Sequence, residues 1–325
     1  MGEFDLIARF FERPQQAAAA HVHAGVDLGI GDDCAVLQPQ AGHQWLVSSD
    51  MLVEGRHFLS TVAPERLGHK ALAVNLSDLA ACGATPRAFT LALALPRADE
   101  AWLEGFARGL FALADAQGIA LVGGDTTQGP LNLCITVMGE VPQGQALLRS
   151  GAREGDDIYV SSTLGDARLA LEVFRGNIAL AGDEFEAARR AMECPQPRVA
   201  LGQALRGVAR SAIDVSDGLL GDLGHILRRS GVGATLMADA LPQSALLSAQ
   251  PLNIRREMGL AGGDDYELVF TAAPDQREAV QRASQAAATP VTRIGRIEAA
   301  AGLRLVDADG KALANAFRGF DHFKS

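Results

Sequence analysis

Six short acidic elements recur along the chain, each an Asp beside Gly or Ser, and they are the residues best suited to chemistry. They are Gly31-Asp32-Asp33, Ser48-Ser49-Asp50, Ser77-Asp78, Gly123-Gly124-Asp125, Asp214-Val215-Ser216-Asp217 and Gly262-Gly263-Asp264-Asp265. Most follow an apolar run, so we expect them at the rim of a sheet, where α/β proteins build their sites. Carboxylates gathered there repel by roughly 4 kcal/mol per close pair near a protein surface, so a shared site needs cations. Hard oxygen ligands of this kind suit Mg²⁺ and the polyphosphates bound with it.

Asp78 and Asp50 have the surroundings that argue most for function. Residues 64–81 are predicted to form a helix, and Asp78 ends a stripe of it that is otherwise apolar, through Leu67, Ala71 and Val74. A carboxylate buried there without a partner is costly, so Asp78 is either turned into solvent at the helix end or held as a metal ligand. Asp50 directly follows an apolar strand, and Ser48 and Ser49 beside it can add hydroxyl or carbonyl oxygens to a hard cation.

The segment 214–219 offers a different kind of site. Asp214 and Asp217 stand at the end of a predicted strand, where we expect them on one face, and Asp217 opens a helix. Ser216 or Asp217 could simply cap that helix, because both residue types favour the position. A helix N-terminus also binds anions, so the cap and a phosphate site can be the same residues. Gly155-Asp156-Asp157, by contrast, is interpreted as a turn.

Familiar phosphate-binding motifs are missing from the chain. There is no GxxxxGK[ST], and Gly29-Ile30-Gly31 lacks its third glycine because position 34 is Cys34. A nucleotide would therefore be held by metal bridges, glycine backbone and a few arginines. Arg149 is a candidate for a charge-assisted phosphate contact, or else a solvated linker residue. His57 could contact a substrate phosphate, although a lone histidine is often a bystander.

The elements that position these residues alternate between strand and helix. In the first half we predict strands at Gln44–Ser49, Ala88–Leu95, Ile119–Val122 and Leu131–Met138, and helices at Pro64–Ala81 and Asp99–Gln117. In the second half we predict strands at Ile158–Val160, Ala212–Val215, Tyr266–Thr271 and Val291–Ile297, and helices from Asp166 and at Glu184–Met192, Arg198–Arg210, Asp217–Arg229 and Gln276–Ala287. The Gly-rich, charged stretch 142–156 is the expected junction between domains 1–141 and 142–325.

Composition limits the class of protein. The 325 residues are enough for two domains, and 48% hydrophobic residues with only 5% aromatic ones favour an α/β (α+β) protein. A formal charge of −10 argues against nucleic acid or an anionic membrane as partner. No signal peptide or membrane span is visible, and Cys34, Cys82, Cys134 and Cys194 form no CxxC pair. We therefore expect a cytoplasmic protein.

The assembled motifs resemble the thiamine-monophosphate kinase family, within the ATP-binding superfamily that includes aminoimidazole ribonucleotide synthetase and selenophosphate synthetase. The resemblance runs end to end. It includes Gly29-Ile30-Gly31-Asp32-Asp33, Lys70 to Ala81, Gly123-Gly124-Asp125-Thr126-Thr127, Ile213 to Leu219, Gly262 to Leu268 and Gly319-Phe320-Asp321-His322-Phe323. Together these motifs are specific for the kinase, whereas one alone would indicate only the superfamily.

That resemblance implies ATP-dependent phosphorylation of thiamine monophosphate by a homodimer, in which the N-terminal mixed sheets of two subunits form a barrel. It also implies that residues 1–141 bind ATP and metal and that a C-terminal α/β domain completes the site. Metal ligands for several Mg²⁺ ions would be Asp33, Ser48, Ser49, Asp50, Asp78, Asp125, Asp214 and Asp217. Gly124, Asp125, Arg149 and Ser216 would contact ATP. His57, Asp264 and Phe320 would hold thiamine monophosphate.

Two positions depart from the family's pattern. Much of the family has Glu where this chain has Asp264, so the shorter side chain would reach the substrate through a water or a shifted backbone. Phe320 can stack on a ring but offers no hydroxyl. Two rival functions remain open: another ATP-dependent reaction of the superfamily, such as aminoimidazole ribonucleotide synthesis, and a non-enzymatic sensor of Mg-nucleotide.

Overall fold

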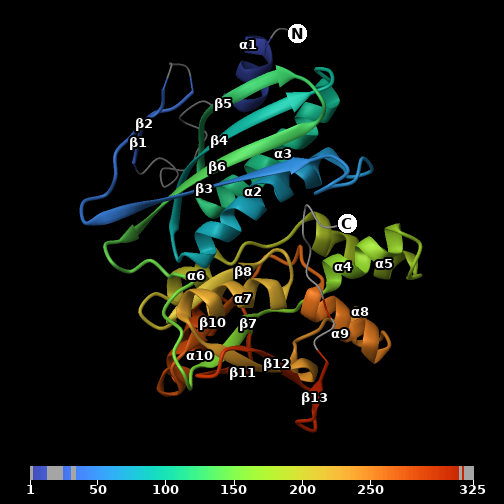
Figure 1. Cartoon of the computed structure of the whole chain (residues 1–325). Coiled ribbons are helices and arrows are strands. Elements are labelled where there is room, and N and C mark those ends of the chain that lie inside the picture. Colours follow the sequence, from blue (N-terminus) through green and yellow to red (C-terminus); the bar gives the residue numbers. More distant parts are fainter. Residues whose placement is uncertain (1–2, 13–24, 31–33, 315–316, 318–325) are drawn as a thin grey trace. The chain divides into compact units, whose positions relative to one another are not determined.

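The structure, a computed structural model, describes residues 3–12, 25–30, 34–314 and 317. The chain divides into two compact units (Figure 1). The first comprises residues 1–79 and 84–144, and the second comprises residues 80–83 and 145–325. The break between residues 144 and 145 falls inside the Gly-rich stretch that the sequence marks as a junction.

A four-stranded mixed sheet is the centre of the first unit. Its strands follow the order β3 (His43–Val53), β6 (Asn132–Pro142), β4 (Thr85–Leu95) and β5 (Ala120–Gln128). The β3–β6 and β6–β4 pairs are antiparallel, and the β4–β5 pair is parallel. The remaining elements outside the long helices are α1 (Glu3–Leu6), the π-helical η1 (Ile7–Phe11) and the antiparallel pair β1 (Val26–Leu28) and β2 (Val36–Leu37). Both β3 and β5 are therefore edge strands of the four-stranded sheet.

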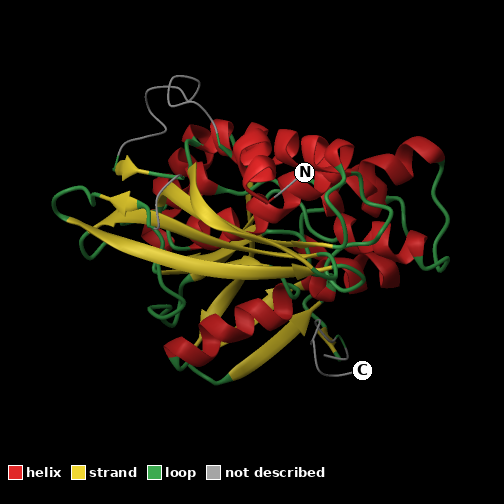
Figure 2. Ribbon diagram, turned by 90° about the horizontal axis from the view of Figure 1, so that it is seen from above, coloured by secondary structure: helices red, strands yellow, loops and turns green. Residues whose placement is uncertain are grey.

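Two long helices, α2 (Pro64–Ala81) and α3 (Glu100–Gln117), cover one face of this sheet (Figure 2). Strand residues on that face, such as Leu133, Ile135 and Val137, are fully buried. The helices approach each other closely because glycines line the contact. A Cβ on Gly68 would lie 2.1 Å from the Phe106 carbonyl oxygen, and one on Gly109 would lie 1.8 Å from that of Glu65. Side chains at either position would force the helices apart.

The opposite face of the sheet is only partly covered. At one end Val26 and Leu37 of the β1–β2 pair pack against Ala88 and Val122. On β3, however, Val47 and Met51 remain 64% and 56% exposed. This chain alone therefore leaves apolar side chains of an edge strand in contact with water.

A seven-stranded sheet forms the second unit. Its order is β13 (Ala312–Leu313), β12 (Gly302–Val306), β9 (Gly233–Met237), β11 (Val291–Glu298), β7 (Asp157–Ser161), β10 (Glu267–Ala272) and β8 (Ser211–Val215). Neighbouring strands are antiparallel except β12 and β9. Helix α7 (Leu219–Ser230) packs Leu219, Leu223 and Ile226 into the same core as strand residues Ile158 and Ile213.

The other helices of this unit are α4 (Asp166–Phe174), α5 (Gly182–Glu193), α6 (Val199–Ala204), α8 (Ala245–Ser248), α9 (Leu252–Ala261) and α10 (Arg277–Ala286), with 3-10 turns η2 (Ala238–Ala240) and η3 (Pro274–Gln276).

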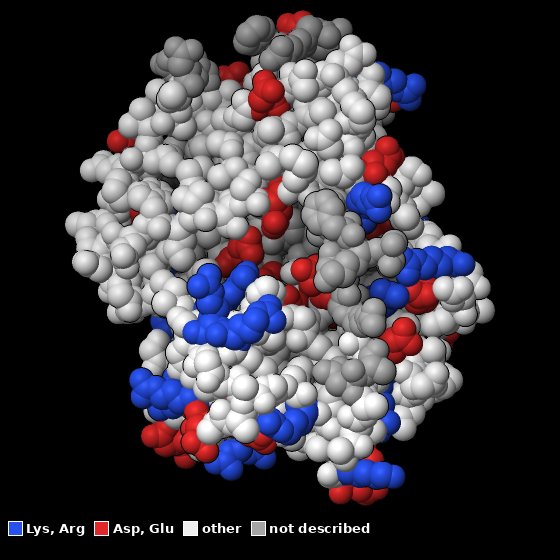
Figure 3. All heavy atoms as spheres, in the orientation of Figure 1, with Lys and Arg blue, Asp and Glu red and all other residues white. Residues whose placement is uncertain are grey.

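Among the described residues no helix is long and apolar enough to cross a membrane. On the face shown in Figure 3, the described residues carry separate basic and acidic groups.

Three expectations about the elements need correction. Strands β3 and β5 extend well past the predicted ends, so Ser48–Asp50 and Gly123–Asp125 lie within strands rather than after them. Polar residues are tolerated there because both strands are edges with one open face. The helix predicted at 198–210 ends at Ala204, and Gly207 adopts a φ of +71° before β8. The turn expected at Gly155 is present, but Asp156 and Asp157 are also buried ion-pair partners of Arg210 and Arg277.

Candidate active site

Helix α2 is joined to strand β3 by two side chains one helical turn apart. The hydroxyl of Ser48 donates a hydrogen bond to Oδ2 of Asp78. The backbone N–H of Asp50 donates to Oδ1 of Asn75 over 3.0 Å, and Nδ2 of Asn75 donates to the carbonyl of Ala71. Ser48 and Asp50 lie on the same face of their strand, as do Asn75 and Asp78 on their helix. The structure thus brings Asp50 and Asp78 to one junction and does not turn Asp78 out into solvent.

Ser49 belongs to the other face of β3. Its hydroxyl lies 3.0 Å from Oγ1 of Thr136 and donates to the carbonyl of Ile135 at 3.2 Å. Of the two predicted serine ligands, only Ser48 therefore faces the Asp78 side of the sheet.

Strand β5 carries the glycine-rich acidic element. Gly124 has a φ of +147°, and a Cβ there would lie 1.9 Å from the carbonyl oxygen of Leu91. In the register of the sheet Asp50 lies opposite Ile135, and Ile135 lies opposite Leu91. Leu91 in turn lies opposite Gly124, with Asp125 next along β5. Asp50 and Asp125 thus occupy neighbouring rows on opposite edge strands, about 14 Å apart at three strand spacings.

His57 lies in a tight turn that follows β3. The backbone N–H of Val53 donates to Nδ1 of His57 at 3.0 Å, and the N–H of His57 donates back to the Val53 carbonyl. Gly55 allows this turn with a φ of +77°. Because Nδ1 accepts a hydrogen bond, the ring proton of neutral His57 is assigned to Nε2. Nε2–H is therefore the donor that a phosphate oxygen could use.

In the second unit, two of the predicted acidic loops interlock. One is the loop Ser216–Gly218 after β8, and the other is the segment 262–266 before β10. The N–H of Asp264 donates to the carbonyl of Ser216 at 2.7 Å. Gly263, with a φ of +72°, approaches so closely that a Cβ would lie 2.7 Å from the same oxygen. The structure therefore places the predicted ATP contact Ser216 directly beside the predicted substrate contact Asp264.

The backbone around Asp264 is strained. Asp264 and Tyr266 adopt φ values of +63° and +53°, in the left-handed region that residues other than glycine rarely occupy. The N–H of Tyr266 is tied to the carbonyl of Val215 at 2.8 Å. Such conformations persist only where surrounding contacts hold them, and they are common at functional sites.

Asp222 organises the first of these loops, and the sequence patterns did not reveal it. Its Oδ2 accepts hydrogen bonds from the backbone N–H groups of Ser216 and Asp217, at 3.0 and 3.1 Å. Burial, followed by the nearby charge of Asp217, raises the pKa of Asp222 to about 7. Helix α7 has Gly218 as its N-cap and no side-chain cap, so neither Ser216 nor Asp217 caps it. Asp217 also lies beyond the strand, so it does not share a strand face with Asp214.

Glu267, which follows the strained segment, is part of the core. It is 5% exposed, and Arg198 binds it through two guanidinium nitrogens, with Nε donating to Oε2 at 2.7 Å. Ser161 donates a further hydrogen bond to Oε2. Burial raises the pKa of Glu267, and the hydrogen bonds and charge of Arg198 oppose this shift. The pair anchors the start of β10 and with it the segment 262–266.

Arg149 lies close to the exposed side of α7. The hydroxyl of Ser230 donates to the Arg149 carbonyl at 3.4 Å. The pKa of His225 is lowered by burial and then by the charges of Arg228 and Arg149. The Arg149 side chain is exposed and forms no ion pair with the described residues, so it is available to an anionic ligand.

The structure gives fewer contacts for the remaining predicted ligands. Asp33 and Phe320 lie outside the described residues. Asp214 is 5% exposed and lies on β8 opposite Leu268. Within the described part of the chain no three His, Cys, Asp or Glu side chains already form a metal cluster. The donors at the α2–β3 junction are carboxylate and hydroxyl oxygens, which fit Mg²⁺ rather than a softer metal.

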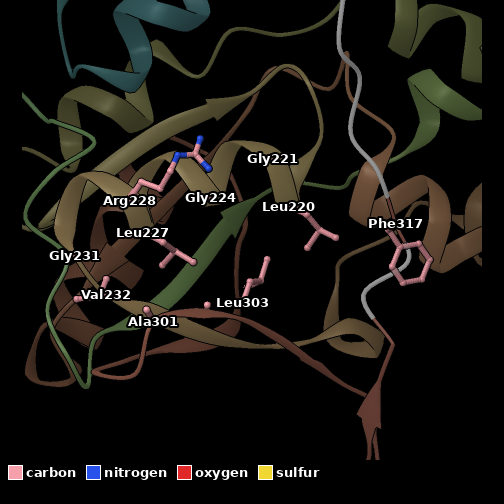
Figure 4. A pocket seen from close by; sticks show the side chains of 11 residues that line it. Leu220, Gly221, Gly224, Leu227, Arg228, Gly231, Val232, Ala301, Leu303 and Phe317 are labelled. Atoms are coloured by element: carbon pink, nitrogen blue, oxygen red, sulfur yellow. The ribbon is translucent and has the colours of Figure 1, made fainter. Parts of the chain in front are cut away.

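A cavity of about 560 Å³ lies beside helix α7 in the second unit (Figure 4). Its apolar lining comes from Leu220 and Leu227 of α7, Leu303 of β12, and Phe317, with Arg228 also part of the lining. None of the predicted ligands that the structure describes lines it.

Family models match both parts of the chain. The N-terminal domain of AIR synthase related proteins matches residues 31–141, and the C-terminal domain of the same proteins matches residues 153–308. Among curated proteins, the thiamine-monophosphate kinase of Salmonella typhimurium is 45% identical over 99% of this chain and 98% of its own length. That of Bacillus subtilis is 35% identical over the whole of both chains.

Solved structures show the same similarity. The thiamine-monophosphate kinase of Stenotrophomonas maltophilia superimposes with a TM-score of 0.83 and 48% identity, over 95% of this chain and 96% of that one. AaThiL complexed with AMPPCP and TMP gives 0.77 and 29% identity over 88% and 89%. The hydrogenase maturation protein HypE in complex with ATP gives 0.76 at 20% identity and shares the fold alone.

Proposed function

Because the chain belongs to the thiamine-monophosphate kinase family, we propose that it phosphorylates thiamine monophosphate to thiamine diphosphate with ATP as donor. The observation that carries this proposal is identity of 45% along the full length of an established kinase. It is supported by AaThiL, a structural relative that binds AMPPCP, an ATP analogue, together with TMP. We also propose that the enzyme works in the cytoplasm, because four isolated cysteines without a CxxC pair suit a reducing compartment.

Residues of both units contribute to each task of the site in this proposal. In the first unit, Asp33, Ser48, Ser49, Asp50, Asp78 and Asp125 would hold Mg²⁺ ions, with Asp214 and Asp217 contributing from the second unit. Gly124, Asp125, Arg149 and Ser216 would contact ATP, and His57, Asp264 and Phe320 would contact thiamine monophosphate. Mg²⁺ supplies charge neutralisation and alignment for two polyanionic substrates when it is bound.

The transfer itself needs no covalent help from the protein. An oxygen of the thiamine phosphate forms a bond to the γ-phosphorus of ATP as the bond from that phosphorus to the β–γ bridging oxygen breaks, and ADP leaves. The attacking oxygen is already anionic near neutral pH, because the second pKa of a phosphate monoester is about 6. No side chain has to act as a general base. His57 donates from Nε2 and Arg149 from its guanidinium to orient the phosphates.

A homodimer with a closed barrel is the assembly that we propose for this site. Two oxygens bound to one Mg²⁺ are at most about 4 Å apart, so Asp50 and Asp125 of one sheet, about 14 Å apart, cannot share an ion. Pairing of β3 of one copy with β5 of a second would join the edge strands and bring the segments Ser48–Asp50 and Gly123–Asp125 of the two copies side by side. It would also cover Val47 and Met51, which one copy leaves exposed.

One assay tests the reaction. ADP release is followed with Mg²⁺ and thiamine monophosphate as the sole acceptor, and the product is identified as thiamine diphosphate by chromatography. Omission of the acceptor or of Mg²⁺ should reduce ADP release to background. Release that is indifferent to thiamine monophosphate, or binding of Mg-ATP without turnover of it, would exclude the kinase proposal.

A further inference from the structure

Asp222 is buried where the chain turns from β8 into α7. Its side chain is 4% exposed. Oδ2 accepts hydrogen bonds from the backbone N–H groups of Ser216 and Asp217. In return the N–H of Asp222 donates to the carbonyl of Gly218 at 3.1 Å. Two consecutive N–H groups thus share one carboxyl oxygen.

This arrangement occupies a position that a bound anion takes in other proteins. The N–H groups ahead of a helix have no partners within the helix, and phosphate often binds them. Here the chain supplies its own acceptor, the carboxyl group of Asp222 in the first turn of α7. The backbone N–H groups of Ser216 and Asp217 are therefore already occupied, and their side chains are left to meet a ligand.

The other side of the same loop is fixed as well. The carbonyl of Ser216 accepts from the N–H of Asp264, and a Cβ on Gly218 would lie 3.0 Å from the backbone of Ala261. The loop is therefore held between the carboxylate of Asp222 and the segment that carries Asp264. A shift of the Asp222 carboxylate would move the residue assigned to ATP and the residue assigned to substrate together.

We propose that Asp222 is a positioning residue of the kinase site: its side-chain oxygen is a built-in hydrogen-bond acceptor that holds Ser216 and Asp217 in place for contact with the phosphates. As a consequence, the phosphates of ATP are bound through metal ions and side chains and not by the N-terminus of α7. This inference rests on the proposed function, because it takes the roles of Ser216 and Asp217 from it.

The test compares Asp222→Ala and Asp222→Asn with Asp239→Ala. Asp239 also accepts hydrogen bonds in the second unit, two from Arg256 and one from the N–H of Ala308, but it lies outside the site. Asp222→Ala should raise the Mg²⁺ concentration for half-maximal activity and the KM for ATP by about tenfold or more. Asn keeps one oxygen acceptor, so Asp222→Asn should stay within about threefold of the parent. Asp239→Ala should lower Tm without changing either constant.

Two measurements separate positioning from simple loss of stability. In the absence of metal and nucleotide, hydrogen exchange at the amides of residues 216 and 217 should be about tenfold faster in Asp222→Ala than in Asp239→Ala. Formate, which replaces the lost carboxylate, should restore activity and amide protection to Asp222→Ala but leave Asp239→Ala unchanged. Unchanged metal dependence and exchange in Asp222→Ala would overturn the proposal, as would an Asn variant as defective as the Ala variant.

Asp217→Asn distinguishes this inference from the function on which it rests. If Asp217→Asn leaves turnover intact, the assignment of Asp217 to the site fails. If Asp217→Asn is inactive while Asp222→Ala behaves as the parent, the assignment stands and the positioning role of Asp222 fails.

Discussion

The side-chain amide of Asn75 positions Asp50 by binding its backbone N–H. It receives the N–H of Asp50 and donates to the Ala71 carbonyl from a side chain that is 1% exposed. We predict that Asn75→Ala lowers kcat/KM by about tenfold and raises the Mg²⁺ requirement, because the Asp50 backbone loses its anchor. Steady-state kinetics at varied Mg²⁺ measures both effects.

Asn177→Ala is the matched control for this change. It removes another side-chain amide donor, Nδ2 to Glu172, far along the chain from the predicted ligands. The Mg²⁺ requirement of this variant should equal that of the parent. Equal Mg²⁺ curves for both asparagine variants would contradict a role for Asn75 in placing Asp50.

Asp239 provides a residue-scale prediction about pH. Hydrogen bonds from Arg256 lower its pKa below the ordinary value. A lowered folded-state pKa means that the ionised group stabilises the fold above the unfolded pKa of about 3.9, and that this contribution is lost as pH falls through the folded value. Asp239→Asn should therefore cost about 2 kcal/mol of unfolding free energy at pH 7 and progressively less below pH 4 in urea titrations. A difference that stays constant down to pH 3 would refute this.

A site residue can be predicted from the sequence only where its type is unusual for its position in a helix or strand. Asp78 was detectable because a carboxylate ends an apolar helical stripe, and in the structure it accepts a hydrogen bond from Ser48 of β3. Asn75 interrupts the same buried helix and leaves a similar signal in the sequence. Asp222 gave none, because an acid in the first turn of a helix is ordinary; its role depends on how the chain folds back over it.

At the scale of elements, two kinds of helix glycine lead to opposite predictions. A Cβ added to Gly221 of α7 would have nothing within 4 Å, whereas a Cβ on Gly109 of α3 would meet the backbone of Glu65. Gly221→Ala should raise the unfolding free energy by up to about 1 kcal/mol through helix propensity. Gly109→Ala should lower it by about 1–3 kcal/mol and reduce turnover, because α2 with Asp78 must move. Thermal and urea unfolding of both variants test this; a stabilising Gly109→Ala would contradict the close contact.

Helix and strand prediction succeeded where periodicity and end signals agree. Helix α2 has the predicted bounds, from Pro64 to Ala81. The predicted start of α7, at Asp217, is two residues early. Asp217 and Gly218 are residue types that commonly begin a helix, but the Asp222 carboxylate binds the backbone before Leu219 and holds it in a non-helical turn. The ends of β3 and β5 were missed because polar residues continue edge strands as readily as they end buried ones.

At the scale of the whole molecule, a site shared between two copies predicts complementation. Asp50→Asn and Asp125→Asn should each abolish turnover. A mixed dimer would combine the intact Asp50 of one copy with the intact Asp125 of the other in one of its two sites. Random mixing of the two inactive proteins should therefore restore about a quarter of the parent activity.

The control is a mixture of Asp50→Asn with Asp78→Asn, whose acids meet at one α2–β3 junction of a single copy. In that mixed dimer each site keeps a damaged junction, so no recovery is expected. Absence of recovery in the Asp50 and Asp125 mixture, after exchange is verified by native mass spectrometry, would contradict the shared site.

Assembly is the level at which the sequence is least informative by itself. Motifs give the acids, but only the strand register puts Asp50 and Asp125 on opposite edges of one sheet. The number of strands between them depends on pairings between segments far apart in the chain, which local patterns do not encode.

The crossing of Gly124 over Leu91 has an evolutionary consequence. Because the backbone at position 124 bends to a φ of +147° with a carbonyl oxygen where any Cβ would go, no other amino acid fits without moving β4 or β5. Every codon change at this site that is not silent should count as a loss in a deep mutational scan. The position is therefore closed to gradual drift for a steric reason, whatever the chemistry of the acid beside it requires.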